Sequence, residues 1–95
     1  MVNEKQVTRF AFIEAMLYVH GMVRRSDVET ALQVKTATAT KLLAAYAAKC
    51  PRAMHYHPGE RAYIAHKPRG KYLDQRGGNA ALFLGAIYRV SGIRG

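Results

Sequence analysis

Residues 34–46 read VKTATATKLLAAY, and this stretch decides the fold. Four of its apolar residues recur at three- and four-residue spacing, which places them on one side of a helix: Ala39, Leu42, Leu43 and Tyr46. The opposite side is small and polar and carries no acidic residue: Thr36, Ala37, Thr40 and Lys41. Small side chains let a helix approach base edges, where hydroxyls and a lysine can form hydrogen bonds. We predict a DNA recognition helix; the alternative is an ordinary surface helix rich in threonine.

A shorter helix is expected just before this stretch. Ser26 and Glu29 have the spacing of a capping box, in which two side chains satisfy free amides at a helix start. The helix is expected to end near Leu32, followed by a tight turn. Two short helices joined in this way form the helix-turn-helix pattern, which many three-helix domains share without contacting DNA. Arg24, Arg25 and the amides near Ser26 can bind a phosphate, and an ordinary solvated turn is an equal alternative.

A β-hairpin is predicted between residues 53 and 66, after Pro51 ends the recognition helix. Residues 58–60, Pro-Gly-Glu, supply the turn. A hairpin directly after a helix-turn-helix is a wing. Basic side chains at its tip and after it are expected to contact the DNA backbone or a neighbouring groove: His57, Arg61, Lys67, Arg69 and Lys71.

Two further helices flank this unit. Residues 4–20 are predicted to form a helix closed by Gly21, with one apolar stripe at Phe10, Ile13 and Leu17 and a second at Phe12, Met16 and Val19. The second stripe meets either another subunit or the core beneath the C-terminal segment. Residues 22–25 are predicted to be a short connection and residues 68–78 a basic linker. Asn79 is expected to cap a last apolar helix over residues 80–90, packed on the domain, on a twin subunit, or on both.

Composition narrows the class of function. The 95 residues suit one small domain, and the net charge of +9 with a pI near 10.1 indicates a polyanionic partner, nucleic acid or an acidic membrane. The charge is uneven: residues 1–50 carry seven Lys and Arg against four acidic residues (+3), and residues 51–95 carry eight against two (+6). No apolar run reaches the roughly 18 residues of a membrane-spanning helix.

Catalytic and metal-binding patterns are weak. The six acidic residues are scattered, and neither a paired carboxylate nor a nucleophile with its base is evident, so no enzyme and no cofactor are expected. A single cysteine, Cys50, excludes an internal disulfide and fits a reducing cytoplasm. His55 and His57 share a strand face near Cys50 and His66, but their spacing matches no strong zinc pattern, so no metal is expected.

The residues resemble a known family, the N-terminal winged helix of BrxR/CapW-type regulators. These are transcriptional repressors with a WYL domain, found beside bacterial anti-phage defence genes. The resemblance covers about residues 8–72 and rests on Arg9-Phe10, Phe12-Ile13-Glu14, Gly21, Arg25-Ser26-Asp27, Ala39-Thr40, Tyr46, Pro51, Tyr56 and Tyr63-Ile64-Ala65. It implies a homodimer on an operator, with residues 35–41 in the major groove and residues 57–61 as the wing.

The chain departs from this family at two places. After Tyr72 a short apolar helix is expected in place of a WYL domain, so ligand sensing through that domain is not carried over. Gln33 stands where the turn of the family usually has glycine.

The sequence thus predicts an α+β, mostly helical protein: a winged helix-turn-helix over residues 1–72, then a basic linker and an extra C-terminal helix over residues 73–95. The expected function is a bacterial or phage transcriptional regulator, a cytoplasmic, nucleoid-associated repressor that binds a palindromic double-stranded DNA operator as a homodimer, without cofactor, metal or membrane. The alternative is a winged-helix module that binds another protein. The residues expected to contact DNA are Arg24, Arg25, Ser26, Lys35, Thr36, Ala37, Thr38, Thr40, Lys41, His57, Arg61, Lys67 and Arg69.

Overall fold

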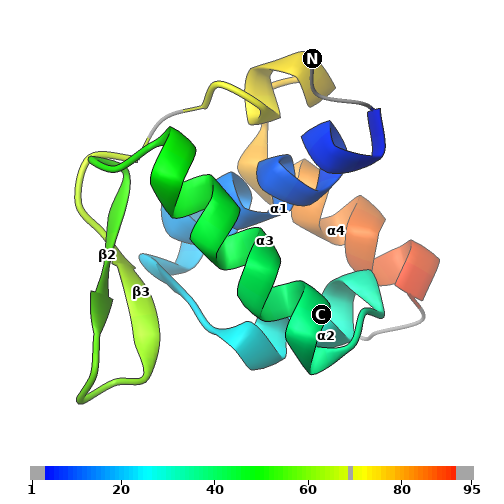
Figure 1. Ribbon diagram of the computed structural model, residues 1–95. Coiled ribbons are helices and arrows are strands. Elements are labelled where there is room, and N and C mark those ends of the chain that lie inside the picture. The colour runs from blue at the N-terminus through cyan, green and yellow to red at the C-terminus, as the bar shows by residue number, and fades with distance from the viewer. Residues whose placement is uncertain (1–3, 69, 92–95) are drawn as a thin grey trace.

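Helices form most of the molecule, and a small sheet lies along one edge beside α3 (Figure 1). The computed structural model describes residues 4–68 and 70–91. The elements follow in the order α1 (Glu4–His20), β1 (Met22–Val23), α2 (Arg25–Leu32), α3 (Thr36–Lys49), β2 (Met54–His57), β3 (Ala62–Ala65), the 3-10 helix η1 (Leu73–Arg76) and α4 (Ala80–Ser91). The α+β, mostly helical winged helix with an extra C-terminal helix is therefore confirmed.

The sheet has the order β1-β3-β2 and is antiparallel throughout. The predicted hairpin is confirmed, with Met54 opposite Ala65 and His57 opposite Ala62. The short connection predicted after α1 is wrong in part, because its first two residues form β1, with Met22 opposite Ile64. Two residues are too few to show the alternation that marks a strand, so only the pairing with β3 reveals this one.

The first helix is buried along most of its length, from Phe10 to Leu17. Its second apolar stripe was expected to meet either another subunit or the core. Phe12 and Met16 of this stripe lie in the core, at 0% and 5% exposure. The Tyr88 hydroxyl of α4 donates a hydrogen bond to the Met16 sulfur at 3.6 Å. Val19, at the end of the same stripe, remains 45% exposed.

A buried carboxylate joins three segments around this core. One oxygen of Glu14, Oε1, accepts hydrogen bonds from the backbone N–H groups of Tyr72 at 2.8 Å and Leu73 at 2.7 Å. The other, Oε2, accepts one from the Tyr46 hydroxyl at 2.7 Å. Burial raises the pKa of the Glu14 carboxyl, although the three donors oppose the shift. Burial and the adjacent Glu14 carboxylate also raise the pKa of Tyr46.

The segment expected to be a basic linker is therefore partly packed. Tyr72 and Leu73 are each 2% exposed, and η1 begins at Leu73. The apolar side chains of these two residues, set among charged neighbours, anchor the segment to α1 and α3. The division of the chain at residues 72 and 73 stays a prediction.

Of the two predicted helix caps, the one for α2 is wrong and the one for α4 is confirmed. The second helix begins at Arg25, and its cap is Arg24, whose backbone N–H donates to Asp27 Oδ2 at 2.9 Å. The predicted cap at Ser26 is wrong, because the carboxylate that accepts the cap N–H belongs to Asp27 and the cap lies two residues earlier. The Asn79 cap is confirmed by the hydrogen bond from the Leu82 N–H to Asn79 Oδ1 at 3.0 Å.

Candidate nucleic-acid interface

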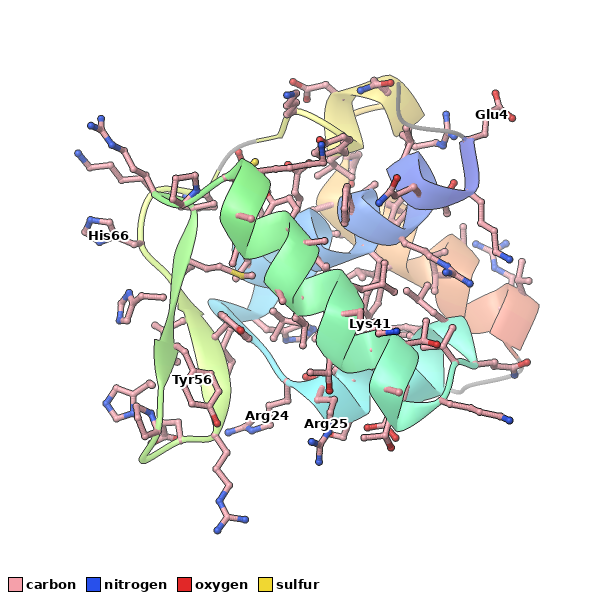
Figure 2. All side chains as sticks on the ribbon, in the orientation of Figure 1. Glu4, Arg24, Arg25, Lys41, Tyr56 and His66 are labelled. Carbon is pink, nitrogen blue, oxygen red and sulfur yellow. The ribbon has the colours of Figure 1, made fainter. Side chains whose placement is uncertain are left out.

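The outer face of α3 is open, as predicted. Thr36, Ala37, Thr40 and Lys41 are exposed, and Thr38 is half-buried. On the inner face Ala39, Leu42, Leu43 and Tyr46 are buried. Figure 2 shows Lys41 on the outer side of the helix, where the labelled Arg24 and Arg25 flank the lower edge of the same face. This helix therefore presents the small, polar face that contact with base edges requires.

A groove of about 690 Å³ lies between α3, the start of α2 and the hairpin. Its walls come from three segments that are separate in sequence: Arg24, Arg25 and Ser26 of the α2 region, Thr40 and Leu43 of α3, and Tyr56, Glu60, Arg61 and Tyr63 of the hairpin. The structure thus brings five of the predicted contact residues to one hollow: Arg24, Arg25, Ser26, Thr40 and Arg61.

Two tyrosines of this groove were missed from the sequence. Tyr56 and Tyr63 lie directly opposite each other on β2 and β3, with ring centroids 5.2 Å apart in an edge-on arrangement. Tyr56 is 52% exposed. Because the two residues pair across the hairpin once its turn is placed at residues 58–60, the strand register was the signal that could have revealed this aromatic wall.

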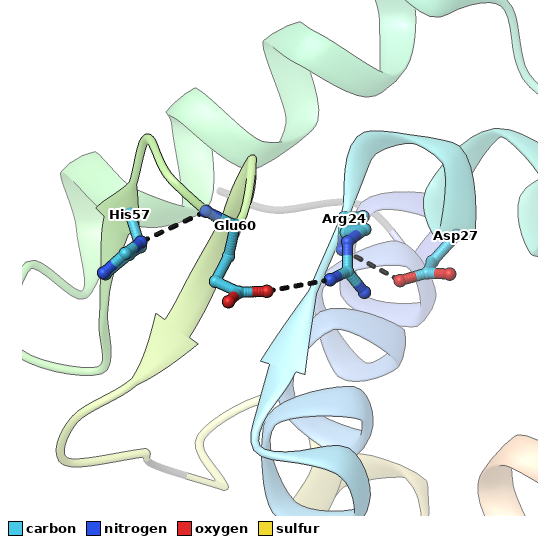
Figure 3. Close-up of polar contacts among 4 residues, drawn as sticks. All are labelled: Arg24, Asp27, His57 and Glu60. Carbon is cyan, nitrogen blue, oxygen red and sulfur yellow. Dashed lines mark hydrogen bonds and ion pairs between the residues drawn. The ribbon is translucent and has the colours of Figure 1, made fainter.

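An ion pair spans the groove from the hairpin turn to the start of α2 (Figure 3). Arg24 Nη2 lies 3.5 Å from Glu60 Oε2, and the backbone N–H of Glu60 donates to His57 Nδ1 at 3.2 Å. The side chains of Arg24 and Glu60 are 41% and 55% exposed. A pair this exposed is worth at most about 1 kcal/mol, so a phosphate can replace the carboxylate.

A second carboxylate lies beside the first turn of α3. Glu29 Oε2 is 3.3 Å from Arg25 Nε, and Glu29 Oε1 accepts a hydrogen bond from the Thr36 hydroxyl at 2.9 Å. Sequence reasoning placed Glu29 in a cap and did not include it in the site. In the structure it engages two of the predicted contact residues, so any ligand of Thr36 competes with Glu29.

The remaining predicted residues lie at the start of α3 and at the two ends of the hairpin. Lys35 is exposed at the cap of α3, and His57 is exposed at the hairpin tip. Lys67 lies at the opposite end, where its backbone N–H donates to the Arg52 carbonyl at 3.0 Å. Arg69 lies outside the described residues.

The histidines of the hairpin form no evident metal centre. The rings of His55 and His66 pack edge-on with centroids 6.1 Å apart. Within residues 4–68 and 70–91, no three His, Cys, Asp or Glu side chains are grouped so that they could hold a metal ion.

A helix-turn-helix of α2 and α3, followed directly by a hairpin whose strands join β1 in one sheet, defines a winged helix domain. A family model described as the BrxR transcriptional regulator winged helix-turn-helix domain matches residues 5–72. The chain belongs to this family of transcriptional regulators, and the resemblance noted in its sequence is confirmed. No curated protein matches the chain. In the part of the chain that the structure describes, no helix has the length and apolar character needed to cross a membrane.

Proposed function

We propose that the chain binds double-stranded DNA with sequence preference and represses transcription as a homodimer on a palindromic operator. The observation that carries this proposal is the open face of α3, lined by Thr36, Thr40 and Lys41, beside a groove that holds three arginines. Occupancy of the operator would exclude the polymerase sterically.

In this proposal α3 lies in the major groove and reads bases. The hydroxyls of Thr36 and Thr40 can donate to or accept from base edges, and the Lys41 ammonium can reach guanine acceptors. Ala37 and Thr38 are small enough for the backbone to come close. The Thr36 hydroxyl must first leave Glu29, so DNA binding exchanges one hydrogen bond for another.

Phosphates would be held around the rim of the same surface. Arg24 and Arg25, with the amides near Ser26 at the start of α2, face one strand of the backbone. His57 and Arg61 at the hairpin tip contact the next stretch of backbone or the adjacent groove. Lys67 and Arg69 are assigned to phosphates as well, and Lys35 either reads a base or contacts a phosphate. Each phosphate contact releases counterions, so affinity should fall steeply as salt rises.

The test of base reading is Thr40→Ala combined with Lys41→Ala. Selection from a random duplex pool should give a symmetric consensus for the wild-type chain. The double variant should bind that consensus at least about 30-fold more weakly while still binding unrelated duplexes, because two base contacts of about 1–3 kcal/mol each are lost.

The matched control is Lys5→Ala combined with Thr30→Ala, two exposed positions outside the groove. Fluorescence anisotropy at several salt concentrations measures the duplex affinity of the wild-type chain, the Thr40/Lys41 variant and the control. An unchanged affinity of the Thr40/Lys41 variant for the consensus would reject α3 as the reading helix. A wild-type chain without salt-dependent affinity for duplex DNA would favour the alternative of a protein-binding module.

The dimer is assigned to the outer face of α4. Since Tyr88 of α4 contacts Met16 of α1, that side of α4 faces the core, and the large apolar side chains left exposed on α4 are Leu82 and Val90, at 70% and 89% exposure. Two chains joined there with two-fold symmetry would address half-sites about 10 base pairs apart.

Leu82→Gln combined with Val90→Gln should convert a dimer into a monomer in sedimentation equilibrium. The midpoint of thermal unfolding, extrapolated to low protein concentration, should hardly change because neither side chain is buried in the chain itself. A variant that remains dimeric would reject this interface, and a symmetric footprint from a monomeric wild-type chain would reject the preformed dimer.

A further inference from the structure

A second hollow lies at the far end of α3, away from the groove. Its volume is about 390 Å³, and it forms where α3 ends and the chain enters β2. Its lining consists of Lys49, Cys50, Pro51, Arg52, Ala53 and Lys71, which we call the basic pocket. The backbone N–H of Lys67 donates to the Arg52 carbonyl at 3.0 Å, which ties the base of the hairpin to one side of it.

The basic pocket gathers positive charge without neutralising it. Lys49, Arg52 and Lys71 are all exposed, and no carboxylate among the described residues forms an ion pair with any of them. The Lys71 ammonium lies 5.5 Å from the centre of the Tyr72 ring, whose side chain is buried, so this cation is held near a fixed support. Like charges gathered in one hollow repel one another, and an anion placed between them removes that repulsion.

The position of the pocket suits the backbone of a bound duplex. The 14 residues of α3 span about 20 Å at a rise of about 1.5 Å per residue, whereas the major groove is only about 12 Å wide. If α3 crosses the groove at an angle to its direction, a helix longer than the groove is wide reaches a phosphate wall with one end. Exposed Ala44 and Ala48 continue the outer face of α3 from Lys41 to the pocket without bulk or charge.

We propose that the basic pocket is a phosphate-binding site and that its ligand is a backbone phosphodiester of the DNA held by α3. The source of the phosphate, though not the site itself, rests on the proposed function. Lys49 and Arg52 bind the non-bridging oxygens, and Lys71 supplies the third positive charge. The duplex is thereby held at both ends of α3, by Arg24 and Arg25 at one end and by the basic pocket at the other.

The decisive variant is Lys49→Gln combined with Arg52→Gln. Its control is Lys5→Gln combined with Arg89→Gln, which removes the same charge from exposed positions on α1 and α4. Duplex affinity is measured by anisotropy over a range of salt concentrations, well below the unfolding midpoint of each protein. At such temperatures every protein is folded, so losing the stabilisation that cations provide at a helix C-terminus does not alter the measured duplex affinity.

The pocket variant should bind consensus and unrelated duplexes more weakly by the same factor, about threefold to tenfold, and its salt slope should decrease in magnitude by about one. A decrease no larger than that of the control would overturn the assignment of a DNA phosphate. A change in base preference would also overturn it, because a backbone contact carries no sequence information.

Inorganic phosphate tests the site independently of DNA. In two-dimensional amide NMR spectra, phosphate should shift the backbone amide resonances at positions 49, 50, 52, 53 and 71 in the wild-type chain and should leave those of the pocket variant unchanged. Shifts without any effect of the variant on DNA affinity would keep the site and reject DNA as the source. If the wild-type chain bound no duplex at all, the proposed function would fail, and the phosphate titration would still decide the site: shifts would support it and their absence would overturn it.

Discussion

One carboxylate contact lies on the inner side of α3, and another lies across the groove on its outer side, between the hairpin turn and the start of α2; the two contacts behave differently. On the inner side Glu14 is fully buried and accepts three hydrogen bonds of 2.7–2.8 Å. On the outer side Glu60 lies 3.5 Å from Arg24, and both side chains are about half exposed. The chemical group is the same, but its surroundings decide whether the contact is permanent or exchangeable.

The difference follows from solvation. A carboxylate removed from water depends on its protein donors, and the donors depend on it, because each buried group left without a partner costs about 1–3 kcal/mol. An exposed ion pair competes with water on nearly equal terms and is worth at most about 1 kcal/mol. The inner contact can therefore hold the recognition helix in place, while the outer one can give way to a phosphate.

The largest expected effect comes from breaking the inner contact. Glu14→Leu would leave the amides of Tyr72 and Leu73 and the hydroxyl of Tyr46 without their acceptor, since the carboxylate serves all three. We expect the free energy of unfolding to fall by about 3–5 kcal/mol, a large part of the stability of a small domain. Urea unfolding followed by circular dichroism measures this change.

Glu14→Gln is the matched control for that experiment. Its side-chain oxygen can still accept from the two backbone amides, and the Tyr46 hydroxyl can turn to accept from the new amide group. The loss should therefore be clearly smaller than for leucine. Equal losses for the two variants would mean that the hydrogen bonds of Glu14 do not anchor α3, and the comparison of the two sides would fail.

The smallest expected effect comes from the outer contact. Glu60→Gln removes the partner of Arg24 and one negative charge from the groove. Stability should change by less than about 1 kcal/mol. Duplex affinity should rise by about twofold to fivefold at low salt, and the gain should shrink as salt screens the charge.

Glu4→Gln is the control here, because it removes the same charge at the exposed start of α1, far from the groove in Figure 2. A gain equal to that of Glu60→Gln would be a bulk charge effect. Weaker binding by Glu60→Gln would show that its pairing with Arg24 positions the hairpin for DNA and is not displaced by it.

Local patterns in the sequence predicted the helices and the hairpin. The spacing of Ala39, Leu42 and Tyr46 specified the buried side of α3, and Pro51 specified its end, because both act through neighbouring residues. The role of Asn79 as a cap was predictable for the same reason. The cap of α2 was not, since Arg24 lacks the side-chain acceptor that marks a cap in a sequence, and only its hydrogen bond to Asp27 reveals it.

The candidate site was only partly predictable. Thr40 and Arg24 were found from the sequence, and their exposure and shared groove agree with that prediction. Glu29 and Glu60 were missed, because the pattern of charges along a chain does not show which of them meet. Tyr56 was missed although the register of the hairpin places it opposite Tyr63. The basic pocket was missed for a related reason: Lys49 and Arg52 come together with Lys71 only when the segment before η1 folds back on the end of α3.

By itself the sequence determined which faces of the helices are apolar and where the hairpin turns, since these depend on residues within a few positions of one another. Its short motifs, spread over residues 8–72, also indicated the family. Tertiary structure alone decided which charges are neutralised and which stay free. Arg24 and Glu60 are 36 residues apart, and Glu14 and Leu73 are 59 apart. Contacts over such separations depend on how the elements pack, so their hydration, and with it their strength, is settled only in the folded chain.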